Sequence, residues 1–298
     1  MEKFKKIINI LRALLCTIRK IPSLIKKQFN DLLNYYNSLQ EQPKIVSKNI
    51  KWYGWKKDNP DHRDFRYKAP LPVENLPVSV DLRKYCPAIE TQGELGSCTA
   101  NALVANIEFL EIKENISFID LSRLFLYYNE RECEGTIDID SGAAIRDGIK
   151  VLKSQGVCPE VEWPYIISNF RKKPNSGCYF HARKHTITAY QRLSSLIDMK
   201  SCLASGYPFV FGFSVYSSFE SDEVSSTGMV PMPAESEECL GGHAVMAVGY
   251  DDIIKKFIVR NSWGKDWGID GYFYLPYEYI THPNLADDFW TITQSNLE

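Results

Sequence analysis

A cysteine preceded by a glutamine and two glycines, in the stretch 92–102, has the residue types needed for acyl transfer. An apolar run with helical spacing follows Cys98, which places the cysteine at or just inside a helix N-terminus. The helix dipole there favours a thiolate, while Gly93 and Gly96 allow a tight turn with exposed N–H groups. A thiolate beside N–H donors and the Gln92 amide would attack a carbonyl and stabilise the oxyanion that forms. Without further residues, Cys98 could equally be a buried structural cysteine, and Gln92 a solvated loop residue.

A histidine and an asparagine far down the chain complete a catalytic set. His243 heads an apolar strand-like run after Gly241-Gly242, and Asn261 follows a second strand-like run. His243 would hold the cysteine as a thiolate and then protonate the leaving amine as a general acid. The amide oxygen of Asn261 would fix the imidazole tautomer. The alternatives are a core histidine and a turn-forming asparagine, but their order after the cysteine favours catalysis.

These motifs resemble those of the papain-family (C1, cathepsin-like) cysteine peptidases. His243 and Asn261 lie 145 and 163 residues after Cys98, and the family places them about 130–150 residues downstream. The histidine spacing fits this range, and the asparagine spacing is slightly longer. The resemblance covers residues 77–298 in order. It rests on these further motifs: Asp81-Leu82-Arg83, Ser141-Gly142-Ala143-Ala144, Trp163-Pro164-Tyr165, Asn261-Ser262-Trp263-Gly264 and Trp267-Gly268.

The resemblance implies an α+β, papain-like fold of two lobes with the active-site cleft between them. The helical left lobe would span about 88–185 and a β-barrel-like right lobe about 186–298. The implied activity is that of a cysteine-type endopeptidase, a thiol protease that hydrolyses peptide or protein substrates through a Cys98 acyl-enzyme. No cofactor is implied, and no metal is expected, because the cysteines and histidines show neither CxxC nor HExxH spacing.

The resemblance also implies substrate-binding residues. Ser141 and Gly142 match the glycine pair that bonds an extended substrate backbone, although Ser141 could instead cap the next helix. Gly242 would leave one wall of the S2 pocket without a side chain. Trp263 and Trp267 would shield the bond between the catalytic histidine and asparagine, or serve as plain core aromatics.

The sequence departs from the family pattern around the nucleophile. Thr99 replaces the usual tryptophan, and Leu95 replaces the cysteine that normally forms a disulfide three residues before the nucleophile. No cysteine follows Cys239, so a second family bridge is absent, while Cys133 and Cys178 could still pair. Loss of bridges favours a reducing, intracellular compartment over a lysosome-like or secreted one.

Residues 1–76 are expected to form an N-terminal pro-region. Residues 1–40 show apolar positions at helical spacing, and residues 1–45 carry a net charge of +6, against −8 for the remainder. We expect basic amphipathic helices there, followed by a Pro-rich extended segment at 42–76 that runs through or beside the cleft as an intramolecular inhibitor. Lower pH is expected to weaken this docking, with trimming near Leu76. A signal peptide or a membrane-surface helix remains an alternative for the first 28 residues.

Composition and local patterns set the remaining expectations. A net charge of −2 gives no bias toward nucleic acids. The rival function is a catalytically inactive binding protein on the same fold, with the basic helix as a membrane or partner anchor.

Apolar periodicity predicts helices at 98–111, 122–130, 143–155 and 199–205, a polar loop at 164–184, and strands at 186–190, 209–215, 243–250, 256–260, 271–275 and 289–293.

Overall fold

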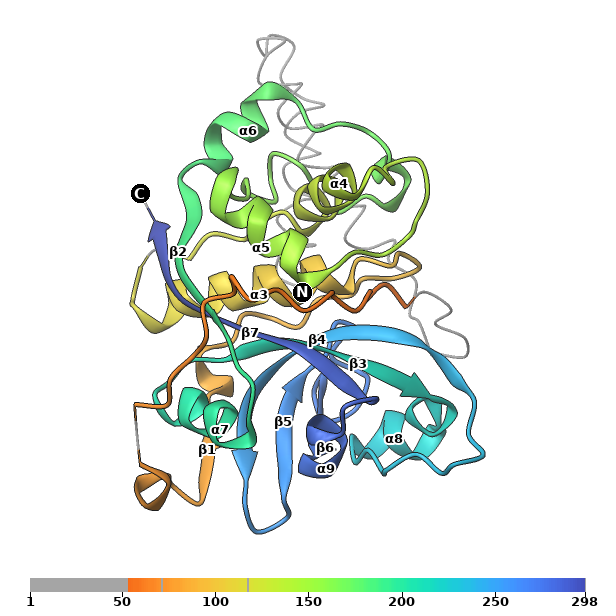
Figure 1. Cartoon of the computed structure of the whole chain (residues 1–298). Coiled ribbons are helices and arrows are strands. Elements are labelled where there is room, and N and C mark those ends of the chain that lie inside the picture. Colours follow the sequence, from red (N-terminus) through yellow and green to blue (C-terminus); the bar gives the residue numbers. More distant parts are fainter. Residues whose placement is uncertain (1–52, 71, 117, 298) are drawn as a thin grey trace, which may run out of the picture. The chain divides into compact units, whose positions relative to one another are not determined.

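The computed structural model describes residues 53–70, 72–116 and 118–297. Contacts within the chain divide it into two compact units, Met1–Val46 and Ser47–Glu298, and every described residue belongs to the second. The basic helices expected at 1–40 therefore lie outside the described residues, as do their signal-peptide and membrane-surface alternatives. The second unit has a helical half and a sheet half, which confirms the expected α+β organisation (Figure 1).

The helical half is arranged around α3 (Cys98–Lys113), which lies between the two halves in Figure 1. Residues 98–111 of α3 are buried on every side, so this helix has no solvent face. The side chain of Ser122 caps α4 (Arg123–Glu134) by accepting the N–H of Phe125. The other two helices of this half are α5 (Ile145–Ser154) and α6 (Ser176–Ala182).

The sheet half contains one antiparallel sheet in the order β2-β7-β3-β4-β5-β6, with β1 added along β4. Within the described part of the chain the sheet stays open, because β2 and β6 each pair with a single neighbour. The expected β-rich lobe is therefore present, with a sheet that does not close into a barrel. The strands are β1 (Ser79–Asp81), β2 (His185–Arg192), β3 (Phe209–Tyr216), β4 (Cys239–Asp251), β5 (Lys256–Arg260), β6 (Tyr272–Pro276) and β7 (Ala286–Leu297).

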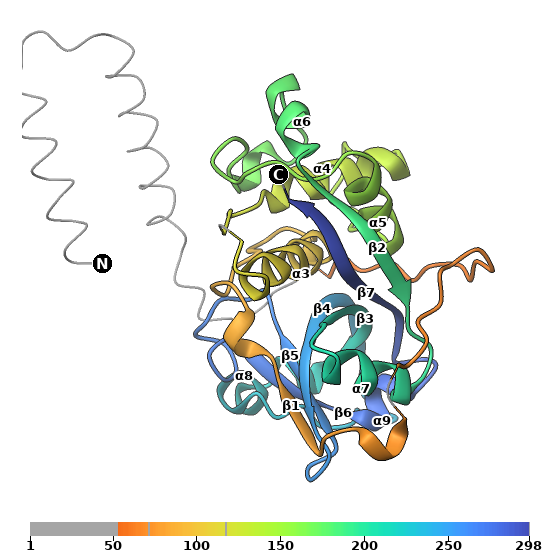
Figure 2. The same ribbon diagram turned by 90° about the vertical axis from the view of Figure 1, so that its left-hand side faces the viewer.

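Two long strands join the halves. β7 pairs with β3 inside the sheet and with β2 along most of its length, and Figure 2 shows β2 and β7 side by side next to α5. α3 packs on β4, so the helix that begins with Cys98 contacts the strand that contains His243. Short elements complete the fold: α7 (Leu196–Ala204), α8 (Asp222–Thr227), α9 (Tyr277–Thr281) and 3-10 turns at Val73–Asn75, Arg83–Tyr85, Ile167–Asn169 and Ser217–Glu220.

Most expected helices and strands are present with ends shifted by a few residues, and three local features differ from what the sequence suggested. The stretch 164–184 contains α6, because the Asn175 side chain accepts the N–H groups of Gly177 and Cys178 and so starts a helix. The helix expected from residue 143 begins at Ile145, and the Ser141 hydroxyl donates to Thr136 Oγ1 instead of capping it. Cys133 is exposed on α4 whereas Cys178 is buried on α6, and both are free thiols.

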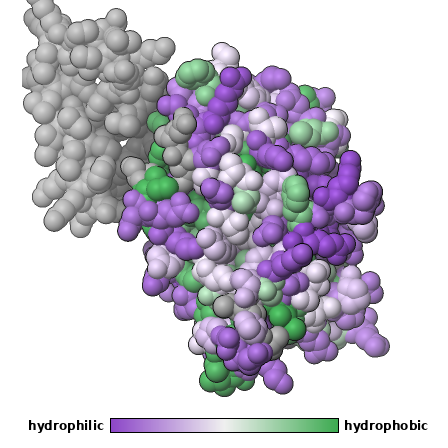
Figure 3. All heavy atoms as spheres, turned by 60° about the vertical axis from the view of Figure 1, so that its left-hand side comes forward, coloured by the Kyte–Doolittle hydropathy of each residue, from purple (hydrophilic) through white to green (hydrophobic). Residues whose placement is uncertain are grey.

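On the face shown in Figure 3, hydrophobic residues form small separate groups among hydrophilic ones. The hydrophobic core lies inside the molecule. On the sheet side it is rich in aromatic residues, and these phenylalanines are fully buried: Phe209, Phe211, Phe213, Phe257 and Phe273. Among the described residues, no helix has both the length and the apolar character needed to cross a membrane.

Candidate active site

Cys98 is the first residue of α3 and is fully buried at the junction of the two halves. Its sulfur lies beside the backbone N–H of Ala244, the residue that follows His243 on β4. The first N–H groups of a helix have no partner within the helix, so the N–H of Cys98 itself is free to serve as an oxyanion donor. The junction of α3 with β4 thus brings the predicted nucleophile to the strand that contains the predicted base.

His243 sits inside β4, opposite Phe213 of β3, and not at the head of a strand as its sequence context suggested. Its Nε2 lies 2.8 Å from Asn261 Oδ1, an oxygen that also accepts the N–H of Ser262 at 2.9 Å. Because this oxygen can only accept, Nε2 carries the proton in the neutral ring. The buried Nδ1 has no hydrogen-bond partner and is left as the base.

Aromatic rings enclose this histidine. Trp263 stacks on the His243 ring with centroids 5.0 Å apart, and Trp267 meets Trp263 edge-on at 5.2 Å. Phe219 packs against both tryptophans. These contacts keep water away from the bond between His243 and Asn261, so the two tryptophans lie where they can act as a shield. Phe213 and Phe219 were not singled out from the sequence, since buried phenylalanines carry no spacing signal of their own.

Gln92 is held in place by its amide oxygen, which accepts the Ser262 hydroxyl at 2.6 Å. Its Nε2 donates to the carbonyl of Leu95 at 3.0 Å. An amide nitrogen has two N–H groups, so one remains for a substrate oxygen. Since Ser262 follows Asn261, one short stretch orients both the predicted oxyanion donor and the imidazole.

Asp140 ties the nucleophile loop to the helical half where the family disulfide is missing. Both of its carboxylate oxygens lie 3.0–3.1 Å from the N–H of Gly96, and it also accepts the Tyr127 hydroxyl. The Tyr127 oxygen in turn accepts the N–H of Gly142 at 3.1 Å. This tie was missed in the sequence, because a lone aspartate before Ser141 gives no sign of a partner 44 residues away.

The segment Tyr53–Lys56 passes between Gly242 of β4 and Ala143, next to these residues. The N–H of Trp55 donates to the Gly242 carbonyl at 2.9 Å. On the other side, Ala143 donates to the Gly54 carbonyl at 2.7 Å and accepts the N–H of Lys56 at 3.1 Å. Figure 1 shows this start of the described chain, in red and orange, crossing between the halves in front of α3. Ala143 therefore makes the main-chain bonds that the resemblance assigned to Ser141 and Gly142.

Glycines make this close approach possible. A Cβ on Gly54 would lie 1.8 Å from the carbonyl oxygen of Gly96, and one on Gly142 would lie 2.0 Å from the Gly54 oxygen. A Cβ on Gly242 would meet the Trp55 carbonyl at 2.6 Å, and one on Gly212 would meet the Trp55 ring at 1.9 Å. Gly142 and Gly242 thus leave room for the backbone of Gly54 and Trp55.

The covered site holds its two titrating groups in their neutral forms. Burial raises the pKa of Cys98 to about 11, although the N–H groups of Ala244 and Gly54 partly oppose this. Burial also lowers the pKa of His243 to about 4, against a smaller opposing effect of the bond to Asn261. Near neutral pH the covered site therefore holds a thiol and a neutral imidazole, because neither charge is solvated.

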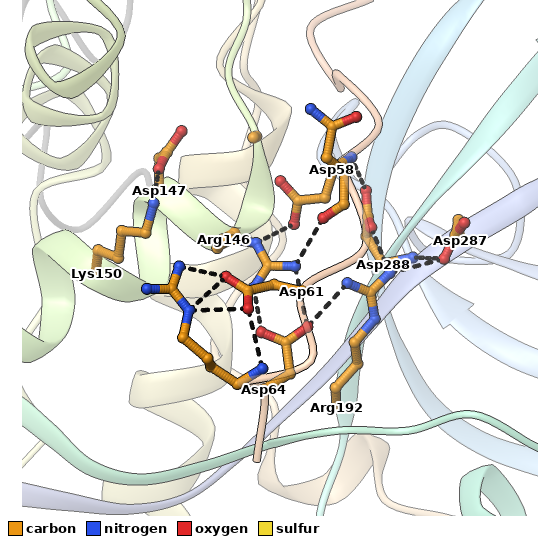
Figure 4. Close-up of polar contacts among 12 residues, drawn as sticks. Asp58, Asp61, Asp64, Arg146, Asp147, Lys150, Arg192, Asp287 and Asp288 are labelled. Atoms are coloured by element: carbon orange, nitrogen blue, oxygen red, sulfur yellow. Dashed lines mark hydrogen bonds and ion pairs between the residues drawn. The ribbon is translucent and has the colours of Figure 1, made fainter. Parts of the chain in front are cut away.

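Buried charges anchor the same segment farther along the cleft (Figure 4). Asp288 Oδ2 accepts the Trp55 indole N–H at 3.0 Å and the Asp58 N–H at 2.8 Å. Arg192 bonds Asp288 at 2.8 Å and also Asp64 at 3.3 Å. Arg146 of α5 lies 3.3 Å from Asp58 and pairs with Asp64 as well. This anchor (Trp55, Asp58, Asp64, Arg146, Arg192, Asp288) connects the segment to α5, β2 and β7.

Comparison with known proteins agrees with this architecture. Residues 76–290 match the family model described as papain family cysteine protease. An uncharacterised peptidase C1-like protein of Acanthamoeba polyphaga mimivirus is 42% identical over 269 residues, covering 81% of this chain and 86% of the relative.

Solved structures are similar as well. The crystal structure of xylellain, a cysteine protease from Xylella fastidiosa, is 46% identical with a TM-score of 0.78, covering 84% of this chain and 99% of xylellain. Procathepsin B S9 from Trypanosoma congolense, at 20% identity and a TM-score of 0.66 over 90% of this chain and 98% of its own, shares the fold. The family match and the two close relatives confirm the family expected from the sequence: the chain is a papain-family cysteine protease.

Proposed function

We propose that the chain is a cysteine endopeptidase whose own N-terminal segment keeps it latent. The observation that carries the latency is the position of Gly54, whose backbone N–H is directed at the Cys98 sulfur. A substrate must present a carbonyl carbon there. The Gly54 carbonyl is instead bonded to Ala143, so the segment fills the cleft without offering a bond to cleave.

Once the segment leaves, the same residues support peptide hydrolysis. His243 Nδ1 takes the Cys98 proton, and the thiolate attacks the peptide carbonyl. The N–H of Cys98 and the free N–H of Gln92 stabilise the oxyanion, and the imidazolium protonates the leaving amine. Water, deprotonated by His243, then hydrolyses the acyl-enzyme and restores the thiol. Rehydration of the cleft favours the thiolate–imidazolium pair, because water solvates both charges.

The position of β1 limits where trimming can occur. β1 pairs with β4, and the carbonyls of Pro77 and Val78 accept bonds from Tyr250 and Asp252, so this stretch belongs to the catalytic unit. The chain just before it, around Glu74 and Asn75, is exposed. We therefore propose residues 1–76 as the pro-region and 77–298 as the peptidase domain, with cleavage near Leu76.

The rival function, a catalytically inactive binding protein, shares the fold and differs in the chemistry of Cys98. After trimming near Leu76, an epoxide reagent should alkylate Cys98, and peptidase activity should be lost as a result. Cys98→Ala should abolish both the alkylation and the peptidase activity. Cys133→Ser is the matched control, because Cys133 is an exposed thiol away from the cleft. Modification concentrated on another cysteine, or trimmed protein without turnover, would support the binding protein instead.

The second prediction concerns the thiol pKa, measured as the pH dependence of Cys98 alkylation. In the trimmed protein the midpoint should lie well below about 8.5, and His243→Ala should raise it toward that value. In the full-length chain the reaction should still be rising above pH 9, because burial holds the pKa near 11. Asn261→Ala should reduce turnover less than His243→Ala, since Asn261 orients the ring and carries no proton. A profile unaffected by His243→Ala would contradict an ion pair.

The third prediction tests latency in the full-length chain. Trp55→Ala removes a half-buried indole and its bond to Asp288, and we expect docking to weaken by about 2 kcal/mol, or roughly 30-fold. Gly54→Ala should release the segment by a different cause, the clash with the Gly96 carbonyl. Both variants should show faster Cys98 alkylation and higher peptidase activity than the unchanged chain.

Phe65→Ala is the control for Trp55→Ala, because Phe65 is an exposed aromatic residue that follows this segment in the chain. It should leave both rates close to those of the unchanged chain. If neither Trp55→Ala nor Gly54→Ala raises the alkylation rate, or if trimmed and full-length proteins are equally active, the inhibitory role is wrong.

The pH dependence of docking follows from Asp58. Burial, followed by repulsion from Asp288, raises the pKa of Asp58 to about 7 against the opposing charges of Arg146 and Arg192. A free aspartate titrates near about 3.9, so the docked state binds more protons than the released state between these values. Acidification from about pH 8 to 4 should therefore tighten this contact, opposite in sign to the acid release expected from sequence. The Cys98–His243 pair adds little, because thiol–imidazole and thiolate–imidazolium hold the same number of protons.

The fourth prediction uses Asp58→Asn, which keeps the side-chain shape and removes the charge. We compare Cys98 alkylation rates of the two full-length proteins at each pH, so that the shared chemistry of Cys98 and His243 cancels. The rate of the unchanged chain relative to Asp58→Asn should increase as pH rises from about 5 to 8, as charging of Asp58 loosens the docked segment. A ratio that does not change with pH would exclude Asp58 as the titrating group.

A further inference from the structure

Three side chains with metal-binding atoms, from Cys158, Glu162 and Cys178, meet in the helical half, and a fourth, His181, contacts Glu162. Cys158 and Glu162 lie in the chain that follows α5, while Cys178 and His181 lie one helical turn apart on α6. The sulfurs of Cys158 and Cys178 and a carboxylate oxygen of Glu162 all lie within 4.8 Å of one another. The spacing is Cys-x3-Glu and Cys-x2-His, and only the fold shows that the two pairs belong together.

The local contacts pair these donor atoms mainly with one another. His181 Nδ1 is 2.6 Å from Glu162 Oε1, yet it is buried and has no aligned hydrogen bond. Both cysteines are buried free thiols that contact each other, and Cys178 also lies 3.7 Å from the Glu162 backbone carbonyl. A buried nitrogen in close, misaligned contact with a carboxylate, next to two buried thiols, is the arrangement expected of ligands around an absent cation.

We propose that Cys158, Glu162, Cys178 and His181 bind one zinc ion. Two sulfurs, one imidazole nitrogen and one carboxylate oxygen form a four-donor set that suits tetrahedral Zn²⁺, and thiolate ligands disfavour Mg²⁺ and Ca²⁺. On binding, each thiol releases one proton to solvent and its sulfur takes the metal bond. Glu162 and His181 are partly exposed, which gives the ion a route from solvent.

A structural role follows from what the site would connect. α6 has seven residues, too few to be stable alone, and it sits between two irregular stretches. Zinc would fasten α6 to the turn that contains Glu160, whose carboxylate accepts the Tyr165 N–H and pairs with Arg123. The Tyr165 hydroxyl donates to the Gln92 carbonyl at 2.8 Å, so this turn also supports the nucleophile loop. The proposed zinc would stabilise the helical half without entering the reaction.

A disulfide between Cys158 and Cys178 is the competing use of the same thiols. A disulfide would not explain the close contact between Glu162 and His181, since neither side chain takes part in it. The reducing compartment expected from the sequence would also keep both thiols available for a metal. Zinc therefore accounts for all four side chains, whereas a disulfide accounts for two.

The test uses the reduced full-length chain with Cys98→Ala, which removes the catalytic thiol as a competing ligand. The protein is stripped of metal and titrated with Co²⁺, whose thiolate complexes absorb in the near ultraviolet and whose tetrahedral complexes absorb in the visible. We expect saturation at one equivalent and loss of both bands when Zn²⁺ is added. Zinc should also raise the thermal unfolding temperature, because it binds only the folded chain.

Two variants in this background locate the site. Cys178→Ser should weaken Zn²⁺ binding by at least about 100-fold and remove the zinc-dependent rise in unfolding temperature. Glu162→Gln, at a partly exposed position that tolerates the change, should weaken binding less and keep the fold if Cys178→Ser does not. Cys133→Ser is the matched control and should bind Zn²⁺ like the parent chain.

Three results would overturn the proposal. The first is that the reduced protein fails to bind one equivalent of Co²⁺ or Zn²⁺. The second is that binding persists unchanged in both Cys178→Ser and Glu162→Gln. The third is that air oxidation joins Cys158 to Cys178 and reduction of that bond restores no metal affinity, which would assign the pair to a disulfide.

Discussion

The packing of the α3 N-terminus against β4 is the contact on which the rest of the structure depends. It places the Cys98 sulfur beside the N–H of Ala244, and so next to His243. Neither half of the molecule holds a usable site alone, since the nucleophile belongs to the helices and the base to the sheet. Asn261 and Ser262 then orient the imidazole and Gln92 from one short stretch after β5. Small shifts of α3 relative to β4 would therefore separate all four groups.

The segment Tyr53–Lys56 changes this junction in two ways at once. Its backbone takes up the hydrogen bonds of Gly242 and Ala143 that line the cleft. Cys98 and His243 are also fully buried in its presence, and burial moves the pKa of Cys98 up and that of His243 down until both groups are neutral. Steric occupation and loss of charge have the same physical origin, since both follow from filling the cleft with a polypeptide. The protonation states of Cys98 and His243 therefore depend on whether the segment Tyr53–Lys56 is in place.

Hydrogen bonds of Asp140 hold the nucleophile loop against the helical half. Asp140 connects the nucleophile loop to Tyr127 and to the loop at Gly142. Leu95 made the loss of one disulfide visible in the sequence, but its replacement was not, because carboxylate contacts leave no fixed spacing. The cluster at Cys158 and Cys178 was likewise not visible in the sequence. Its two cysteines are separated by the loop and 3-10 turn before α6.

The sequence by itself determined the family, the α+β division and the order of the nucleophile, base and orienting residue. These features follow from local chemistry: a glycine-rich turn before a helix, and apolar runs with strand or helix period. It did not determine that Ala143 would pair with Gly54 and Lys56, that the sheet would stay open, or that Asn175 would start α6. It also did not indicate that Asp58 would be buried next to Asp288. Each of these depends on distances between residues far apart in the chain, and only tertiary packing decides which backbone groups meet and which carboxylates are buried together.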